Sequence, residues 1–181
     1  MHKLLVKYGA SIGAKNRWSN TPLHDASSTG FSDIIQLLLE HGADVNARNA
    51  SYNTPLNLAA WNRKLAAAWL LVKHGASIGA QNQWSNTPLH HASAPGHLDI
   101  ILLLLEQDAD IESRNIDHNT PLHLAVRNGK KMAVQLLLNH RADIHARNKD
   151  LYTPLQLASQ NRYLDVARLL SEHRAEAGGR N

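Results

Sequence analysis

The tripeptide Thr-Pro-Leu recurs at a fixed spacing along this chain of 181 residues. Its five copies lie 33 residues apart, with no insertion or deletion between them, and begin at Thr21, Thr54, Thr87, Thr120 and Thr153. A fixed period of about 20 to 50 residues is typical of solenoids and related arrays, in which each repeat is one small unit that packs on its neighbours. The period therefore predicts a stack of equivalent units.

Each repeat carries the pattern of two helices. Thr21 suits the N-cap of a short helix, and Pro22 suits its first position, where the missing amide donor costs nothing. Gly30 and Gly42 can adopt the left-handed conformation that often follows a helix. The segment 32–42 predicts a second helix, because its apolar residues Ile34, Leu37 and Leu38 share one face.

The five signatures read TPLHDA, TPLNLA, TPLHHA, TPLHLA and TPLQLA, and each precedes an apolar second helix and a segment of the GADVNARN type. In period and signature, essentially the whole chain resembles the ankyrin repeats. The resemblance implies an all-α solenoid with short β-hairpin fingers, in which first helices and fingers line a concave groove. It also implies a buried imidazole that ties neighbouring units together at His24, His90 and His123, where the other two repeats have Asn57 and Gln156.

We predict a single ankyrin-like domain over residues 1–181. A partial repeat at 1–15 would be followed by complete repeats at 16–48, 49–81, 82–114, 115–147 and 148–180. Neither end carries the polar cap that solenoids normally need, which favours an excerpt from a longer array. The segments 4–24 and 70–90 differ at only three positions. They therefore indicate a duplicated block of two repeats, natural or designed.

Composition narrows the classes of function. Lys and Arg number 19 against 15 Asp and Glu, so the net charge of +4 is mild and its location matters most. The chain has no cysteine, which agrees with a reducing compartment, and it has neither a signal-peptide pattern nor a membrane span. We expect an intracellular protein of the cytoplasm or nucleus, without membrane contact, metal or cofactor, and either monomeric or part of a longer array.

The string WSNTPLHHAS at 84–93 combines two adjacent histidines with two serines, as a hydrolytic site might. An almost identical string, WSNTPLHDAS, stands at 18–27. Equivalent histidines one repeat apart do not converge on one metal or nucleophile. Motifs of zinc proteases, nucleophile elbows and phosphate loops are also missing. The sequence therefore predicts no enzymatic activity.

Aromatic residues supply the first candidates for partner contacts. Trp61 aligns with Ser28, Ala94, Arg127 and Gln160, a position expected to face the groove, and is the preferred central contact. Trp18 and Trp84 are expected at finger tips, where each would anchor a partner or pack against the adjacent finger. The full predicted contact set is Arg17, Trp18, Asp25, Arg48, Trp61, Asn62, Trp84, His91, Arg114, Arg127 and Arg147.

Asp25 and His91 are polar where the other repeats have leucine. Both are expected on the groove face, either as ligand contacts or as simple surface variation. A second column, which we call the basic column, precedes each finger and comprises Lys15, Arg48, Arg114, Arg147 and Arg180, with Gln81 at the end of the second repeat. Each member is followed by asparagine where many ankyrin repeats have aspartate. The column is either a solvated face or a stripe suited to an acidic peptide or a phosphate backbone.

Several turns lack the glycine of the family. The finger turn has Ser19, Tyr52, Ser85, His118 and Leu151, and the end of the second helix has Asp108, Arg141 and Arg174 in the last repeats. A non-glycine residue at positive φ costs about 1 kcal/mol. We therefore expect the C-terminal repeats to fray first.

These features predict a protein-binding module that holds a partner protein or acidic peptide in its groove and on its fingers. Binding of nucleic acid or another polyanion by the basic column is the second hypothesis. A small-molecule or catalytic groove near Asp25, Trp61 and His91 is the third. The partner itself is not encoded in the shared framework, because recognition depends on surface side chains.

Overall fold

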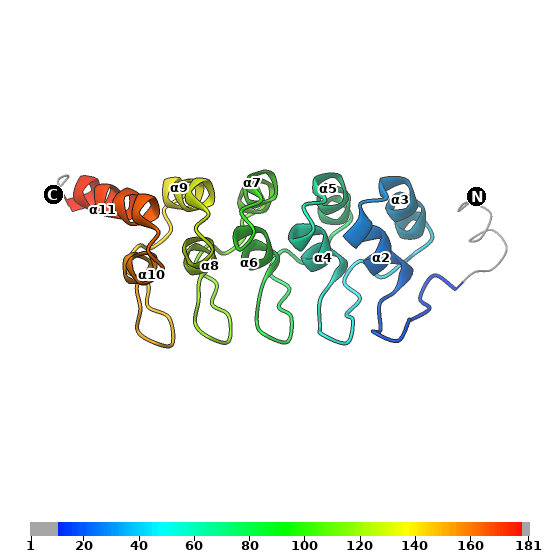
Figure 1. The fold of residues 1–181 in the computed structure, drawn as a ribbon. Helices are drawn as coiled ribbons and strands as arrows, with labels where there is room; N and C mark the ends of the chain where they lie inside the picture. The colour runs from blue at the N-terminus through cyan, green and yellow to red at the C-terminus, as the bar shows by residue number, and fades with distance from the viewer. Residues whose placement is uncertain (1–10, 179–181) are drawn as a thin grey trace.

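The computed structural model describes residues 11–178, with side chains through residue 175. Within these residues the chain forms ten helices in two rows, and loops project beyond the row of first helices (Figure 1). The first helices are α2 (Pro22–Thr29), α4 (Pro55–Trp61), α6 (Pro88–Ser93), α8 (Pro121–Arg127) and α10 (Pro154–Gln160). The second helices are α3 (Ser32–Glu40), α5 (Leu65–Lys73), α7 (Leu98–Glu106), α9 (Lys131–Asn139) and α11 (Leu164–Gly178).

The first helices begin at the Thr-Pro pair of each signature, as predicted. In α4, for example, the hydroxyl of Thr54 accepts the amide of Asn57, and proline takes the first turn. Gly30 and Gly42 adopt positive φ angles of 86° and 83° after the helices they follow. Helix starts and stops are thus encoded locally in each repeat.

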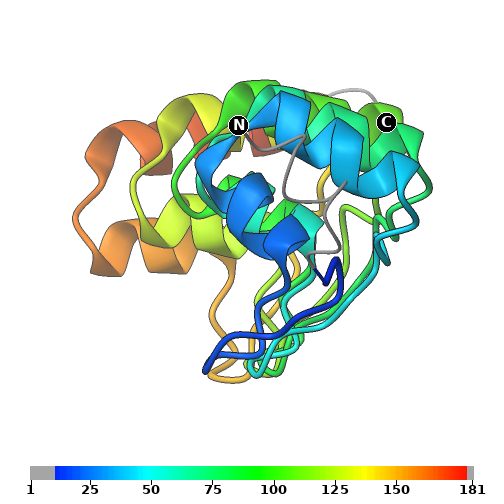
Figure 2. The ribbon, with the colours of Figure 1, turned by 90° about the vertical axis from the view of Figure 1, so that its right-hand side faces the viewer.

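The core is continuous through the stack. The signature leucines of the first four repeats are buried, as are residues of the second helices such as Ile35, Leu71 and Leu104, whereas Leu155 of the fifth signature is only partly buried. Helices with substantial contact belong to the same repeat or to adjacent ones. Seen from the N-terminal end, successive repeats do not superimpose, so the stack twists along its length (Figure 2). This arrangement confirms the predicted helical solenoid.

The fingers are loops rather than two-stranded hairpins, and residues 11–178 contain no β-strand. In one finger, the amide of Asn49 donates to the carbonyl of Asn53 over 3.1 Å. Between neighbouring fingers the main chain makes a bond such as that from Ala50 to the carbonyl of Trp18, at 3.0 Å. These isolated main-chain bonds do not form the regular hydrogen-bond pattern of a β-sheet. All five finger-turn residues have positive φ, between 56° and 64°, as expected: Ser19, Tyr52, Ser85, His118 and Leu151.

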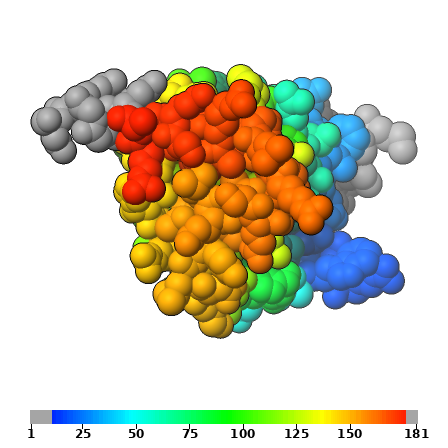
Figure 3. Space-filling model, turned by 60° about the vertical axis from the view of Figure 1, so that its left-hand side comes forward, coloured from blue at the N-terminus to red at the C-terminus, as the bar shows by residue number. Residues whose placement is uncertain are grey.

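The two ends of the chain depart from the repeat pattern. Asp108 and Arg141 have the expected positive φ of 57° and 67°. The prediction of a helix end at Arg174 is wrong, because α11 continues to Gly178. In the earlier repeats, the residue three positions after this turn packs on the core and anchors the chain there: Val45, Ile78, Ile111 or Ile144. The aligned residue of the last repeat is only an alanine. Helices α10 and α11 cover the C-terminal end of the stack (Figure 3). Most of the predicted partial repeat, as well as Arg180, lies outside the described residues.

Candidate partner-binding cavity

A cavity of about 430 Å³ lies between the first helices and the fingers in the middle of the stack. Helices α4, α6 and α8 supply its apolar wall through Leu58, Ala94 and Leu124. Trp61 from the end of α4 and Trp84 from a finger complete the wall, and both tryptophans remain half exposed. The polar residues of the cavity are Asn53, Asn86, His90 and His91. We call this the tryptophan cavity.

Trp61 is held in place from two sides. Its indole meets the imidazole of His91 in a T-shaped arrangement, with ring centroids 5.7 Å apart and planes at 86°. Its main-chain carbonyl accepts a hydrogen bond from Nε2 of His97 over 3.1 Å. The two sequence candidates Trp61 and His91 therefore contact each other, although they are 30 residues apart in the sequence.

Asn82 determines which ring nitrogen of the neutral His91 imidazole carries the proton. Its Oδ1 accepts the amides of Trp84 and Asn86, both at 3.0 Å, which fixes the orientation of the side-chain amide. Its Nδ2 is then the donor to Oδ1 of Asn53 at 2.9 Å and to Nε2 of His91 at 3.2 Å. An imidazole that accepts at Nε2 carries its proton on Nδ1. Burial, with a smaller contribution from neighbouring His90, lowers the pKa of His91 to about 4, so the ring is neutral at neutral pH.

The same asparagine pattern repeats along the fingers and forms what we call the asparagine ladder. Nδ2 of one asparagine donates to Oδ1 of the asparagine 29 positions earlier, at 2.8 to 3.1 Å, in the pairs Asn49–Asn20, Asn82–Asn53, Asn115–Asn86 and Asn148–Asn119. A carboxylate could accept the finger amides but could not donate to the preceding finger. Asparagine in place of the family's aspartate therefore has a structural role that the sequence analysis missed. The signal was the Asn-x-x-x-Asn spacing in successive fingers.

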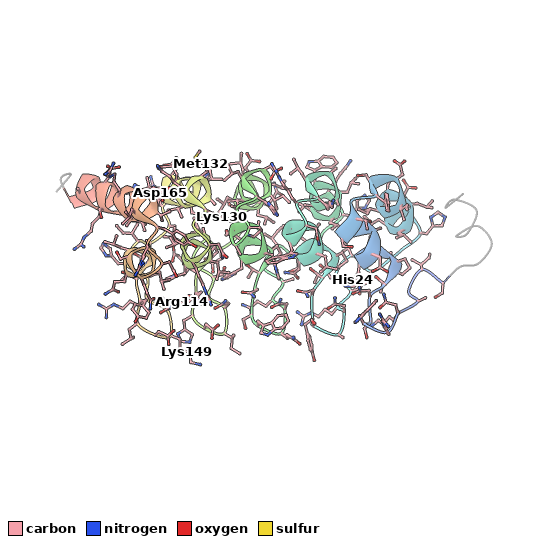
Figure 4. The ribbon with its side chains drawn as sticks, viewed as in Figure 1. His24, Arg114, Lys130, Met132, Lys149 and Asp165 are labelled. Atoms are coloured by element: carbon pink, nitrogen blue, oxygen red, sulfur yellow. The ribbon has the colours of Figure 1, made fainter. Side chains whose placement is uncertain are left out.

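The buried histidines occupy the positions that the family resemblance implies. Nε2 lies 3.0 Å from the carbonyl of Asn53 for His24, 2.9 Å from that of Asn119 for His90, and 3.2 Å from that of Tyr152 for His123. Figure 4 shows His24 beside its finger. Burial lowers the pKa of all three imidazoles, and that of His90 to about 4.

Asn57 and Gln156 replace this histidine only in part. Asn57 accepts from the amide of Thr54 but donates to Ala80 at 3.3 Å, not to the following finger. Gln156 is exposed and bonds only to Thr153 among the described residues. The second repeat therefore lacks the link from the first helix to the following finger that His24, His90 and His123 provide in their repeats.

The members of the basic column that the structure describes, Lys15, Arg48, Arg114 and Arg147, are exposed. Arg114 lies near the start of its finger, whereas Lys149 lies at the tip of the next (Figure 4). Arg114 donates from Nη1 to the carbonyl of Arg147 over 3.4 Å, and the guanidinium of Arg48 lies 5.8 Å from the ring of Tyr52. Among residues with described side chains, the one ion pair is Arg63–Asp99 at 3.4 Å. The column arginines therefore have no carboxylate partner in that part of the chain.

The remaining predicted contacts lie outside the tryptophan cavity. Arg17 stacks on Trp18, with its guanidinium carbon 3.9 Å from the ring centroid. Asp25 accepts from Nδ2 of Asn20 at 3.2 Å and lines a separate hollow near the first finger. Asn62 donates to the carbonyl of Leu58 at the end of α4, at 2.9 Å. Arg127 lines another hollow, which it shares with carboxylates of Asp117 and Asp150.

Comparison with known families agrees with this architecture. A family model described as ankyrin repeats in three copies matches residues 1–82, 51–115 and 89–181. This chain belongs to the ankyrin-repeat family. Ankyrin repeats generally serve as modules for protein–protein interaction. A search of curated proteins finds no match to this ankyrin-repeat chain.

Two further features are missing from the described part of this ankyrin-repeat protein: a cluster of metal-ion ligands and a membrane-spanning helix. No three histidine, aspartate or glutamate side chains gather there as ligands for a metal ion. None of the described helices has both the length and the apolar character needed to cross a membrane.

Proposed function

We propose that this ankyrin-repeat protein is a non-enzymatic interaction module that holds a segment of a partner protein in the tryptophan cavity. The observation that carries the proposal is the meeting of Trp61, Trp84 and His91 around one apolar hollow. Trp61 and Trp84 are 51% and 47% exposed, so each has a large surface that a partner could bury. Because the indole of Trp61 already packs against the ring of His91, binding would cost less of its side-chain conformational entropy than for an unsupported tryptophan.

The chemistry of the cavity supports binding rather than catalysis. Both ring nitrogens of His90 are engaged by Thr87 and Asn119, so His90 has no nitrogen available for a substrate. The low pKa of His91 makes it a weak base at neutral pH. Asp25, the carboxylate of the catalytic hypothesis, lines a different hollow.

Binding of a polyanion is the second candidate, because the column arginines have no carboxylate partner among the described side chains. A phosphate backbone would use these exposed arginines and leave the tryptophan cavity empty. Its affinity would fall steeply and linearly with the logarithm of the salt concentration. The two functions therefore depend on different residues and respond differently to salt.

The test is a quantitative comparison of captured proteins with matched variants. Trp61→Ala and Trp84→Ser introduce residues that stand at the aligned positions Ala94 and Ser51, so both should fold. Trp69→Gln is the control, because Trp69 is half exposed on α5 outside the cavity and aligns with Gln36 and Gln135. Proteins enriched from lysate by wild type and by the control, but not by the double variant, are then purified and titrated.

We expect the purified partner to bind the Trp61→Ala/Trp84→Ser variant at least about tenfold more weakly than wild type, because large aromatic anchors dominate interface energies. The Trp69→Gln control should bind as wild type. A short DNA duplex is titrated in parallel over a range of salt concentrations. Tight DNA binding at about 0.15 M salt, with no effect of the double variant on any ligand, would establish the polyanion function instead.

A further inference from the structure

The polar groups that the tryptophan cavity offers to a ligand are donors. Asn53 and Asn86 already use Oδ1 to accept from the next rung of the asparagine ladder, at 2.9 Å in each case. Their Nδ2 groups have no acceptor among the described residues. His91 uses Nε2 to accept from Asn82, so its remaining ring nitrogen carries a proton. The rim thus presents two amide N–H₂ groups and one imidazole N–H.

Hydrogen bonds fix which side of each amide group is the donor, and which nitrogen of His91 carries the proton. The amides of Trp84 and Asn86 fix Oδ1 of Asn82, and Asn82 in turn fixes Asn53 and His91. Likewise the amides of Asp117 and Asn119 fix Oδ1 of Asn115, which leaves Nδ2 of Asn115 to donate to Asn86. Main-chain donors therefore determine the donors that Asn53, Asn86 and His91 present at the rim.

No residue that lines the cavity is charged at neutral pH, and none is acidic. A buried donor that loses water must find an acceptor, because an unpaired polar group opposes binding. A partner that presents lysine ammonium groups would place donors against donors. One that presents carboxylates or main-chain carbonyls would satisfy the rim. The cavity volume of about 430 Å³ is sufficient for a large side chain with its flanking main chain.

Resting on the proposed function, we infer that the tryptophan cavity selects an apolar or aromatic residue that is flanked by acidic residues in an extended segment of the partner. The apolar side chain packs between Trp61 and Trp84. The flanking carboxylates and carbonyls accept from His91, Asn53 and Asn86.

The experiment uses the full chain and four fluorescein-labelled peptides in fluorescence polarisation. Their cores are Asp-Asp-Phe-Asp-Asp, Asn-Asn-Phe-Asn-Asn, Lys-Lys-Phe-Lys-Lys and Asp-Asp-Ala-Asp-Asp. We expect the first to bind at least about tenfold more tightly than the third, whose flanking side chains are donors, and than the fourth, which lacks the large apolar anchor. The asparagine peptide has the anchor but only neutral acceptors, so its affinity should be intermediate. The titrations are repeated at about 0.5 M salt, where long-range attraction is screened.

Two variants separate the rim donors from the general positive charge. His91→Leu introduces the leucine found at the aligned positions Leu58, Leu124 and Leu157 and removes one donor without changing the net charge. It should weaken the Asp-Phe peptide about fivefold, as expected for one lost hydrogen bond. Arg48→Gln, which copies Gln81, removes a charge from the basic column outside the cavity. It should weaken the same peptide less than about twofold at 0.5 M salt.

The inference is overturned if the Lys-Phe peptide binds as tightly as the Asp-Phe peptide, or if His91→Leu leaves the Asp-Phe affinity unchanged. It is also overturned if none of the peptides binds. In each case the proposed function is judged separately, by whether Trp61→Ala/Trp84→Ser weakens the captured partner. If binding of the partner depends on both tryptophans but basic flanks are preferred, the proposed function stands and the inferred preference for acidic flanks is wrong.

Discussion

The imidazole of His90 in α6 donates from Nε2 to the carbonyl of Asn119, 2.9 Å away in the finger of the next repeat. Its other nitrogen accepts the amide of Thr87 at 3.2 Å, at the start of its own helix. His90 is fully buried, and burial lowers its pKa to about 4. One neutral side chain therefore caps a helix and ties it to the following finger.

Stability should fall as the medium becomes acidic. An unfolded histidine has a pKa of about 6.5, so between that pH and about 4 the unfolded state binds more protons than the folded state. The contribution of His90 is complete above pH 6.5 and is lost as the pH falls toward 4. It amounts to about 3 kcal/mol, and His24, His91 and His123 act in the same direction. Urea unfolding from about pH 7.5 to 4.5 measures it.

His90→Asn is the matched control for this pH dependence, because Asn57 occupies the equivalent position. The variant should be less stable than wild type at pH 7.5 but should lose less stability on acidification. The slope should decrease by up to about 1.4 kcal/mol per pH unit, the value for one proton. Equal slopes for the two proteins would contradict the assignment to His90.

The asparagine ladder should tolerate aspartate only where no donor is needed. Asn115→Asp keeps the acceptor for the amides of Asp117 and Asn119 but places a carboxylate oxygen against Oδ1 of Asn86. We expect a loss of about 1 to 3 kcal/mol in the free energy of unfolding. Asn16→Asp is the control, because the exposed side chain of Asn16 makes no donor bond to a described residue and only accepts the amides of Trp18 and Asn20. Comparable losses in both variants would rule out the ladder as the cause.

Replacing Arg63 should show whether backbone strain or an ion pair matters more. Arg63 has a φ of 54°, where aligned repeats have Gly30, Gly96 and Gly129. Its ion pair with Asp99 is long, at 3.4 Å, and the arginine side chain is 65% exposed. Such exposed pairs contribute about 0 to 1 kcal/mol, whereas relief of positive φ gives about 1 kcal/mol or more. Arg63→Gly should therefore match or exceed wild type in urea midpoint, and Arg63→Ala, which keeps the strain, should not.

The C-terminal repeat should open before the middle of the stack. The main packing of α10 is against α8, and that of α11 is against α9, besides the contact between the two helices themselves. By contrast, α6 packs between α4 and α8. Hydrogen exchange followed by mass spectrometry should show earlier deuterium uptake in α10 and α11 than in α6 and α7, because local opening follows local contact. Uniform protection would indicate a single cooperative unit.

The sequence by itself determined the features that depend on residues close together in the chain. The Thr-Pro starts of the helices and the glycines after α2 and α3 follow from local propensity. The positive φ at Tyr52 and Leu151 opposes the propensity of those residues and was expected only because the family has glycine at the finger turn. The family resemblance added the role of the buried histidines. Both hold because each repeat encodes the same local structure independently.

The tertiary structure decided which of the candidate residues meet. Trp61 ends a helix, Trp84 lies in a finger and His91 lies within the next first helix, α6, so the meeting of these residues depends on how two repeats stack. The proton position on His91 depends on Asn82, which is itself oriented by main-chain amides of its finger. The helix end predicted at Arg174 was wrong for the same reason, since such a turn requires a residue packed on the core. Packing and hydrogen bonds between distant segments, unlike helix caps, are not encoded in any local pattern.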